Sequence, residues 1–194
     1  AAGCFEHIIV STDDDEIAAV AREWGAETPF LRPANLADDH TGTTAVVIDA
    51  IQRLEALGLH ADSYCCIYAT VPLIRARDLL HAYQLLTASQ ADYAFSAAAF
   101  GFPIQRALQL DADGCATPLW PEHIAKRSQD LTPAYQDAGQ FYWGRREAWL
   151  GGRGVFDGRG LAQLLPRYRV VDIDTEEDWQ LAELLYRVLH QHDV

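Results

Sequence analysis

The sequence contains no methionine and little positive charge. Its 15 lysine and arginine residues face 28 aspartate and glutamate residues, so the formal net charge is −13, and Lys126 is the only lysine. A charge of this sign disfavours duplex nucleic acid and anionic membrane surfaces as partners, because both are negatively charged. Arginine therefore carries nearly all the positive charge, and it suits planar recognition of carboxylates and phosphates.

The sequence also lacks the patterns of disulfide-rich, zinc-binding and membrane proteins. Its four cysteines form no CxxC pair, and its seven histidines show no HExxH or other zinc-ligand spacing. No apolar stretch approaches the length that spans a bilayer, and no signal-peptide pattern is visible. Cys65 and Cys66 lie inside an apolar run, which predicts reduced, buried thiols and a cytoplasmic protein.

What is present is an ordinary globular composition, with 49% hydrophobic and 22% charged residues. The 194 residues suffice for a single domain with its own core. Strand-like and helix-like patterns alternate, which predicts an α/β fold with a doubly wound, mostly parallel sheet. The expected strands are residues 6–11, 63–68 and 92–98, a short extended piece spans 28–31, and the expected helices are 13–24, 43–57 and 76–87.

The alternation breaks in the middle of the chain. Residues 105–110 and 116–119 flank Asp111-Ala112-Asp113-Gly114, which is a hairpin signal, and aromatic residues and prolines crowd residues 120–135. We therefore expect an inserted antiparallel subregion, residues 100–135, that packs against a second subunit in a homodimer. After it we expect a return to the sheet over 140–143, a helix over 145–150, a strand over 169–173 and a closing helix from Thr175 to about Gln191.

The most informative local pattern is the run VVDIDTEEDW, residues 170–179. On a strand, alternate side chains share a face, so Asp172 and Asp174 should point the same way. Two like charges so close favour a cation between them, and Mg²⁺ takes one or two carboxylates together with substrate phosphates. Thr175 can cap the helix that follows, with Asp178 three residues on as a short variant of the capping box. The alternative to a metal site is a solvated strand end followed by an acidic helix start.

Polar residues also follow the other expected strands. In an open parallel sheet, ligands bind beyond the carboxyl ends of the strands. Residues 11–14, 68–72 and 97–106 follow three such ends, and residues 172–174 follow a fourth. Their convergence favours a catalytic site at this edge of the sheet.

Four motifs in order carry a family resemblance. They are IVSTDD at 9–14, PFLRP with LADDHTGT at 29–43, RSQDL at 127–131 and DIDT at 172–175. Together they resemble the cytidylyltransferases that activate nine-carbon acidic sugars, the CMP-sialic acid synthetase family, from about Cys4 to the closing helix. The segments CCIYAT and DAGQFYWG, at 65–70 and 137–144, resemble its pseudaminic acid branch.

The resemblance implies a nucleotide-diphospho-sugar transferase-like fold and a reaction. The anomeric hydroxyl of the sugar attacks the α-phosphorus of CTP, and pyrophosphate leaves. Asp172 and Asp174 would be the catalytic Mg²⁺ ligands, and Arg32 and Thr43 would contact the nucleotide. Sugar contacts are expected from Tyr68, Thr70, Arg127, Gln129, Asp137 and Gln140.

Plainer roles stay open for several of these residues. Arg32 could simply close the loop before Pro33, and Thr43 could be a helix N-cap. Tyr68 could belong to the core. Arg127 and Gln129 could make dimer contacts only. No role is assigned to Asp38 and Asp39.

Two departures from the family pattern matter. Sialic acid synthetases carry Gln-Pro-Thr-Ser-Pro where this chain has Tyr68-Ala69-Thr70-Val71-Pro72, which favours pseudaminic acid and leaves sialic, legionaminic and 3-deoxy-octulosonic acids as alternatives. Nothing matches the Gly- and Arg-rich loop that wraps the triphosphate, which the family pattern would place before Ala1. We therefore expect weak or absent CTP turnover by residues 1–194 alone, and an inactive dimerising or ligand-binding domain is the alternative class.

Overall fold

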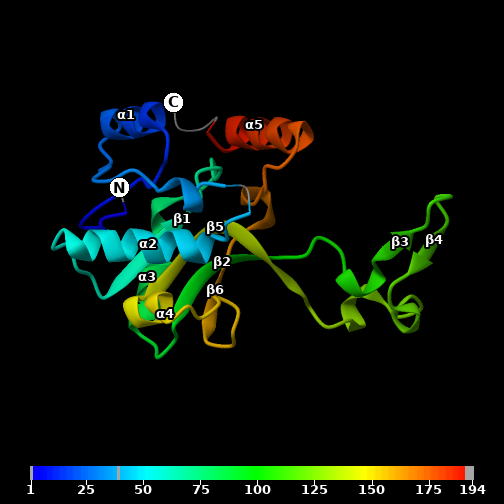
Figure 1. Ribbon diagram of the computed structural model, residues 1–194. Coiled ribbons are helices and arrows are strands. Elements are labelled where there is room, and N and C mark those ends of the chain that lie inside the picture. The colour runs from blue at the N-terminus through cyan, green and yellow to red at the C-terminus, as the bar shows by residue number, and fades with distance from the viewer. Residues whose placement is uncertain (1, 39, 191–194) are drawn as a thin grey trace. The chain divides into compact units, whose positions relative to one another are not determined.

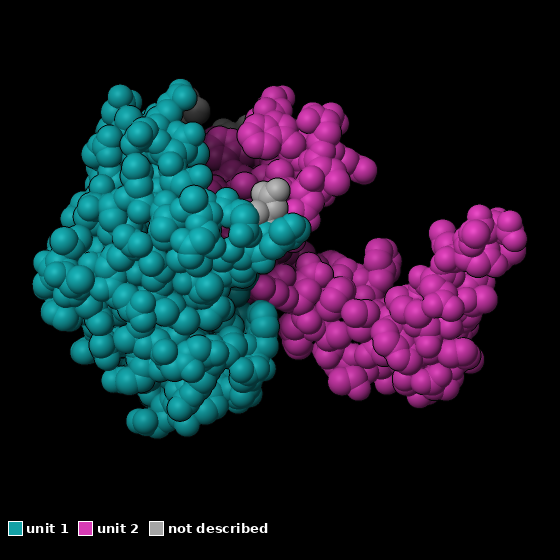
Figure 2. Space-filling model, in the orientation of Figure 1, with its two compact units in different colours: residues 1–67, 75–95, 141–161 teal, residues 68–74, 96–140, 162–194 magenta. Residues whose placement is uncertain are grey.

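The computed structural model describes residues 2–38 and 40–190. Asp39 and Gln191, the latter the expected end of the last helix, lie outside the described residues. The chain forms two compact units, coloured separately in Figure 2. Unit 1 comprises residues 1–67, 75–95 and 141–161, and unit 2 comprises residues 68–74, 96–140 and 162–194.

A four-stranded sheet has the strand order β1-β5-β2-β6 (Figure 1). Strand β1 pairs antiparallel with β5, so that Ser63 lies opposite Arg145. Asp92 N donates to Arg159 O at the start of β2 and β6, and Leu165 N donates to Ala97 O at their ends, so these two strands run parallel. The α/β class is confirmed, with a mixed sheet. The bounds are β1 Ser63–Ile67, β2 Tyr93–Ala99, β5 Tyr135–Arg145 and β6 Gly160–Leu164.

The helices begin and end close to the expected residues. The Asp14 carboxylate accepts hydrogen bonds from Glu16 N and Ile17 N at 2.7 and 2.9 Å, which caps the first helix. Gly25 and Gly58, with φ of +87° and +83°, follow the ends of the first two helices, as their sequence positions predict. The bounds are α1 Asp15–Glu23, α2 Thr43–Ala56, α3 Ala76–Thr87, α4 Arg146–Leu150 and α5 Glu176–His190.

Short 3₁₀ turns connect many of these elements. They span Ala34–Leu36, Ile104–Arg106, Pro121–His123, Ser128–Asp130 and Arg167–Arg169. Within the described residues, no helix combines the length and apolar character needed to cross a membrane.

Two tryptophans organise the core of unit 1. Trp143 on β5 stacks on Phe5, with ring centroids 5.0 Å apart, and its indole N–H donates to Leu79 O of α3 at 3.0 Å. Trp149 on α4 meets Tyr93 edge to face at 5.0 Å, and its N–H donates to Tyr64 O. Each buried indole thus has its one polar atom paired, so the rings contribute apolar area without an unsatisfied donor.

The thiols of Cys65 and Cys66 on β1 form no disulfide. Burial raises the pKa of Cys66 to about 11 and also raises that of Cys65. This agrees with the expected reduced state. The strand itself is only half-buried, because β1 stands at one end of the sheet order.

The expected hairpin in unit 2 is confirmed. Strands β3 (Leu108–Leu110) and β4 (Ala116–Pro118) pair antiparallel, with Leu108 opposite Pro118. The Asp111 carboxylate accepts hydrogen bonds from Asp113 N and Cys115 N at 3.0 and 2.8 Å, and Gly114 has φ +81°. The Asp-x-Asp-Gly turn chemistry therefore sets the hairpin.

Two expected strands are wrong. Residues 6–11 make a single parallel bridge, Ile9 to Glu27, in place of a full strand. Residues 169–173 are not a strand, because Arg169 N and Val170 N donate to Pro166 O and Arg167 O and so close a 3₁₀ turn. Strand β6 was not expected, because GLAQL is short and carries glycine and glutamine.

Gly144 on β5 leaves no room for a side chain. A methyl group there would lie 2.3 Å from Trp149 Nε1 and 2.6 Å from Tyr93 Cε1. We predict that Gly144→Ala lowers the free energy of unfolding by about 1–3 kcal/mol, because these packed rings cannot both shift. Urea unfolding measures this.

Gly42→Ala is the control, because a methyl group there meets nothing within 4 Å. It should cost clearly less than Gly144→Ala. Equal stability of the Gly144→Ala variant and the unsubstituted protein would contradict the prediction.

Candidate active site

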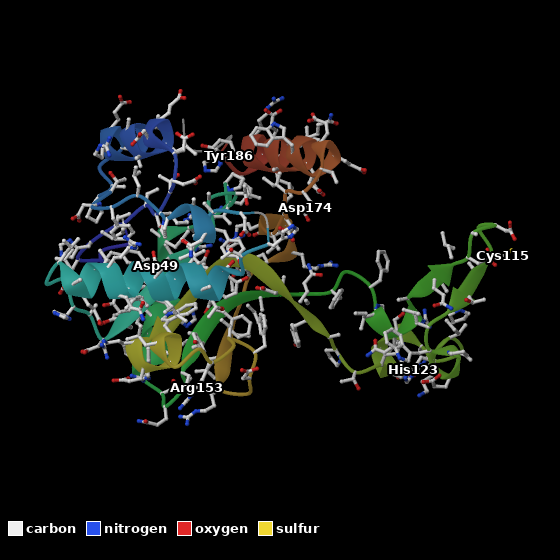
Figure 3. The ribbon with its side chains drawn as sticks, viewed as in Figure 1. Asp49, Cys115, His123, Arg153, Asp174 and Tyr186 are labelled. Atoms are coloured by element: carbon white, nitrogen blue, oxygen red, sulfur yellow. The ribbon has the colours of Figure 1, made fainter. Side chains whose placement is uncertain are left out.

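The carboxylates of Asp172 and Asp174 are exposed in unit 2. They follow the turn Arg167–Arg169, and the backbone of Val170 is extended. Exposure alternates along the segment, with Ile173 half-buried between two exposed aspartates. Figure 3 labels Asp174 just before α5. The segment is not a strand. The alternation of exposed and half-buried residues nevertheless agrees with the expectation that both carboxylates lie on one solvent-exposed side.

The C-terminal end of this segment is fixed by a capping box. Asp178 Oδ2 accepts hydrogen bonds from Thr175 N at 2.9 Å, from Thr175 Oγ1 at 2.7 Å and from Asp174 N at 3.3 Å. Asp178 N donates in return to Thr175 Oγ1. These bonds stabilise the carboxylate and lower the pKa of Asp178 below its ordinary value of 3.8. The expected capping pair is therefore confirmed.

The N-terminal end of the segment is fixed by Gln140 of β5. Its side-chain Nε2 donates to Arg169 O at 2.5 Å. Its backbone N donates to Ser96 Oγ at 3.1 Å, and its carbonyl accepts from Tyr68 N at 3.1 Å. Gln140 is 2% exposed, so these contacts are made inside the protein.

The turn before Gln140 adjoins the first carboxylate. The Asp137 carboxylate accepts from Gly139 N at 3.0 Å, and Gly139 adopts φ +61°. A Cβ built on Gly139 would lie 4.0 Å from Asp172 Oδ1. Four of the predicted residues, Tyr68, Asp137, Gln140 and Asp172, are therefore linked through this short stretch of β5. Thr70 is exposed two residues beyond Tyr68.

The predicted carboxylate-binding residues lie on the turn Ser128–Asp130 and just before it. Arg127 and Gln129 are both exposed. The Arg127 guanidinium donates from Nε and Nη2 to the two carboxylate oxygens of Asp130, at 2.8 and 3.0 Å. The side chain is therefore already arranged in the planar fork that binds a carboxylate.

The predicted nucleotide residues lie in unit 1. The Arg32 guanidinium donates from Nε to Ser11 Oγ at 3.3 Å and from Nη2 to Ser11 O. Its backbone N donates to Thr12 O at 2.7 Å. Thr43 is the first residue of α2 and Gly42 occupies the N-cap position, so the alternative role of Thr43 as an N-cap is wrong.

Comparison with known proteins decides the family. A family model described as "Cytidylyltransferase" matches residues 1–159. The chain belongs to this cytidylyltransferase family. The "Pseudaminic acid cytidylyltransferase" of Campylobacter jejuni is 42% identical over 97% of this chain and 82% of its own length. A Helicobacter pylori protein, "Pseudaminic acid cytidylyltransferase and UDP-2,4-diacetamido-2,4,6-trideoxy-beta-L-altropyranose hydrolase", is 32% identical over 87% of this chain and 32% of its own.

A solved structure supports the fold of this cytidylyltransferase. The structure of CMP:2-keto-3-deoxy-manno-octonic acid synthetase complexed with CTP superposes with a TM-score of 0.62 and 16% identity, over 97% of this chain and 83% of the other. The predicted resemblance and the nucleotidyltransferase fold are thereby confirmed.

The residues that hold the carboxylate segment of the cytidylyltransferase were not all predicted. Ser96 and Gln140 were not expected to bond each other, although each is a polar residue within an apolar strand, in YAFSAAA and GQFYW. A polar side chain in such a run must find a hydrogen-bond partner when it is buried. A polar residue within an apolar strand therefore indicates that both Ser96 and Gln140 need a partner. It does not indicate that Arg169 O is the partner of Gln140.

The capping box generates a stability prediction for the cytidylyltransferase. Thr175→Ala should lower the free energy of unfolding by about 1 kcal/mol at pH 7. Because the folded-state pKa of Asp178 is lowered, its stabilising bonds are intact above pH 3.8 and are lost as the pH falls through the lowered pKa. The difference between the two proteins should therefore shrink in acid.

Urea unfolding from pH 7 down to pH 3 measures that difference. Gln180→Ala is the control on α5, because it removes only the exposed bond from Gln180 to Glu176. A Thr175→Ala penalty that does not change with pH would contradict the role given to the Asp178 carboxylate.

Proposed function

We propose that the protein transfers CMP from CTP to an acidic nine-carbon sugar, pseudaminic acid, and releases pyrophosphate. The observation that carries the reaction type is the exposed carboxylate pair of Asp172 and Asp174, whose first member adjoins Gly139. The choice of sugar rests on relatives named for pseudaminic acid, among them the Campylobacter jejuni protein that is 42% identical to this chain.

Asp172 and Asp174 would hold a divalent cation, Mg²⁺. In the described residues, no group of three or more His, Cys, Asp or Glu side chains could hold a metal ion. Two carboxylates are nevertheless enough for Mg²⁺, which keeps several waters and takes its other ligands from phosphates. When bound, Mg²⁺ neutralises phosphate charge and lowers the pKa of a coordinated hydroxyl.

The other residues bind and orient the two substrates. Arg32, held against Ser11, would donate from its planar guanidinium to the cytosine carbonyl, and Thr43 would lie near the cytidine. Tyr68, Thr70 and Asp137 would contact the sugar. Bringing the anomeric hydroxyl into line with the α-phosphorus supplies much of the rate enhancement in reactions of this kind.

Arg127 and Gln129 would bind the sugar carboxylate. Arg127 already holds the carboxylate of Asp130 through two parallel N–H···O bonds. The same two guanidinium N–H groups would donate to the carboxylate of an acidic sugar. Gln140, the other residue that the resemblance names as a sugar contact, is 2% exposed.

A second sugar is favoured by one specific similarity. The Campylobacter jejuni CMP-N,N'-diacetyllegionaminic acid synthase is 53% identical to this chain over 51 residues, which is 26% of the chain. The pseudaminic similarity covers 97% of the chain, so it carries more weight. Legionaminic acid is therefore the comparison substrate.

The reaction is tested by pyrophosphate release from the full gene product that contains residues 1–194. We expect release that requires CTP, Mg²⁺ and pseudaminic acid together, with slower release for legionaminic and sialic acids. Calorimetry follows CTP binding in parallel. Absence of release with any of these sugars would overturn the proposal, and CTP binding without release would support the ligand-binding alternative.

The carboxylate pair is tested separately. Asp172→Asn and Asp174→Asn should each lower kcat by about 100-fold or more, because each removes a charge from the site where phosphate charge is neutralised. Glu183→Gln is the control, an exposed acid of the same unit paired with Arg187. Equal kcat for the Asn variants and the unsubstituted enzyme would remove these residues from the mechanism.

We also propose that the subregion 100–135 forms a homodimer contact. Leu108 and Leu110 on β3 share one face of the strand and are 56% and 69% exposed, and Phe102 is 86% exposed. Large exposed apolar side chains within one segment are typical of an interaction surface. A second copy of the chain is the partner favoured by the aromatic and apolar content of the same subregion.

Light scattering tests this contact. The double substitution Leu108→Asp with Leu110→Asp should convert dimers to monomers at micromolar concentration, because it buries charge in the contact. Gln109→Asp adds a charge to the opposite face of the same strand and should leave the dimer intact. A protein that is monomeric before substitution would refute the proposed contact.

A further inference from the structure

Both the amide group and the methylene groups of the Gln140 side chain are buried. Its Oε1 is buried and has no hydrogen-bond partner among the described residues, while its Nε2 donates to Arg169 O at 2.5 Å. The reverse orientation of the amide would bring two oxygens together at this distance, so the NH₂ group must face the carbonyl. A head group enclosed in this way does not reach a ligand at the surface.

The carbonyl that Gln140 holds lies three residues before Asp172. The opposite end of the same segment is held by the Asp178 carboxylate, which accepts from Asp174 N and Thr175 N. The stretch from Arg169 to Asp174 has no strand pairing of its own. Its position therefore depends on bonds at its two ends, and Gln140 supplies a side-chain bond at the N-terminal end, beside the 3₁₀ bonds of Arg169 N and Val170 N.

The backbone of Gln140 is itself fixed on both sides. Its N–H is bound by Ser96 Oγ and its carbonyl by Tyr68 N. Ser96 is fully buried on β2. Ser96 and Tyr68 thus fix the backbone of Gln140, whose side-chain amide donates to Arg169 O. Supporting contacts of this kind fix the geometry of a site.

We propose that Gln140 is a positioning residue for the carboxylate pair of Asp172 and Asp174, and does not contact the sugar. This inference rests on the proposed function. Mg²⁺ demands near-ideal octahedral geometry, so a displaced carboxylate segment weakens metal binding. Outer residues that orient metal ligands typically change metal affinity by about 10–100-fold when they are substituted.

Gln140→Met tests the proposal, because methionine has nearly the same length and lacks the amide donor. Free Mn²⁺, measured by electron paramagnetic resonance in the presence of CTP, gives the metal affinity without turnover. We expect the dissociation constant of Mn²⁺ to rise by about tenfold or more. In the full gene product kcat should fall in parallel, while KM for the sugar stays within about twofold, because no uniform sugar-binding contact is removed.

Gln163→Met is the matched control. It makes the same substitution at another buried glutamine, on β6, and leaves the amide of Gln140 in place. We expect it to lower stability with little change in Mn²⁺ affinity. Gln140→Glu is the second variant should Gln140→Met fail to fold, because it keeps the size of the side chain and replaces the donor with an acceptor.

The outcomes separate the alternatives. A raised sugar KM with unchanged Mn²⁺ affinity in the Gln140 variants would establish direct sugar contact and overturn the proposal. Equal effects of Gln140→Met and Gln163→Met on Mn²⁺ affinity would reduce Gln140 to a stability role and also overturn it. Mn²⁺ affinity that Asp172→Asn leaves unchanged would refute the proposed function itself, and the proposal with it.

Discussion

Electrostatic repulsion between neighbouring carboxylates is the constraint on which the site depends. Asp172 and Asp174 are separated by one residue, and Asp178 brings a third carboxylate to the same short stretch. The Asp178 carboxylate accepts hydrogen bonds from two N–H groups and one O–H group. These bonds keep it ionised and hold it against the backbone. The first two carboxylates remain exposed, and a cation bound between them relieves their repulsion. The local fold therefore separates one structural acid from two that are open to a ligand.

Strand β5 carries the residues that connect the core to this chemistry. Trp143 anchors the helix α3 through Leu79 O, and Gln140 anchors the carboxylate segment through Arg169 O. Both side chains donate a single N–H to a backbone carbonyl. Buried donors of this kind specify one arrangement of the chain, because the alternatives leave a polar group without a partner.

Local chemistry made the helices, the hairpin and the capping box predictable from the sequence. Asp14, Gly25 and Gly58 act through bonds to residues within a few positions, so their effect can be read along the chain. Strand pairing depends on distant segments, and here the prediction failed. The apolar run that ends at Ile173 resembles a strand, but the N–H groups of Arg169 and Val170 donate within a 3₁₀ turn, to Pro166 O and Arg167 O. Asp172 and Asp174 were proposed from the pattern of one short segment, whereas the bond from Gln140 to Arg169 O joins distant segments, and no local pattern encodes it.

The ion pair of Arg127 with Asp130 has a further consequence for any acid that binds there. Each carboxylate oxygen of Asp130 already occupies one N–H of the guanidinium fork. An incoming anion must therefore displace an internal one, and its net gain is the difference between two similar ion pairs. Because both side chains are largely exposed, breaking the internal ion pair costs little, and Asp130 can take back the guanidinium when the acid departs.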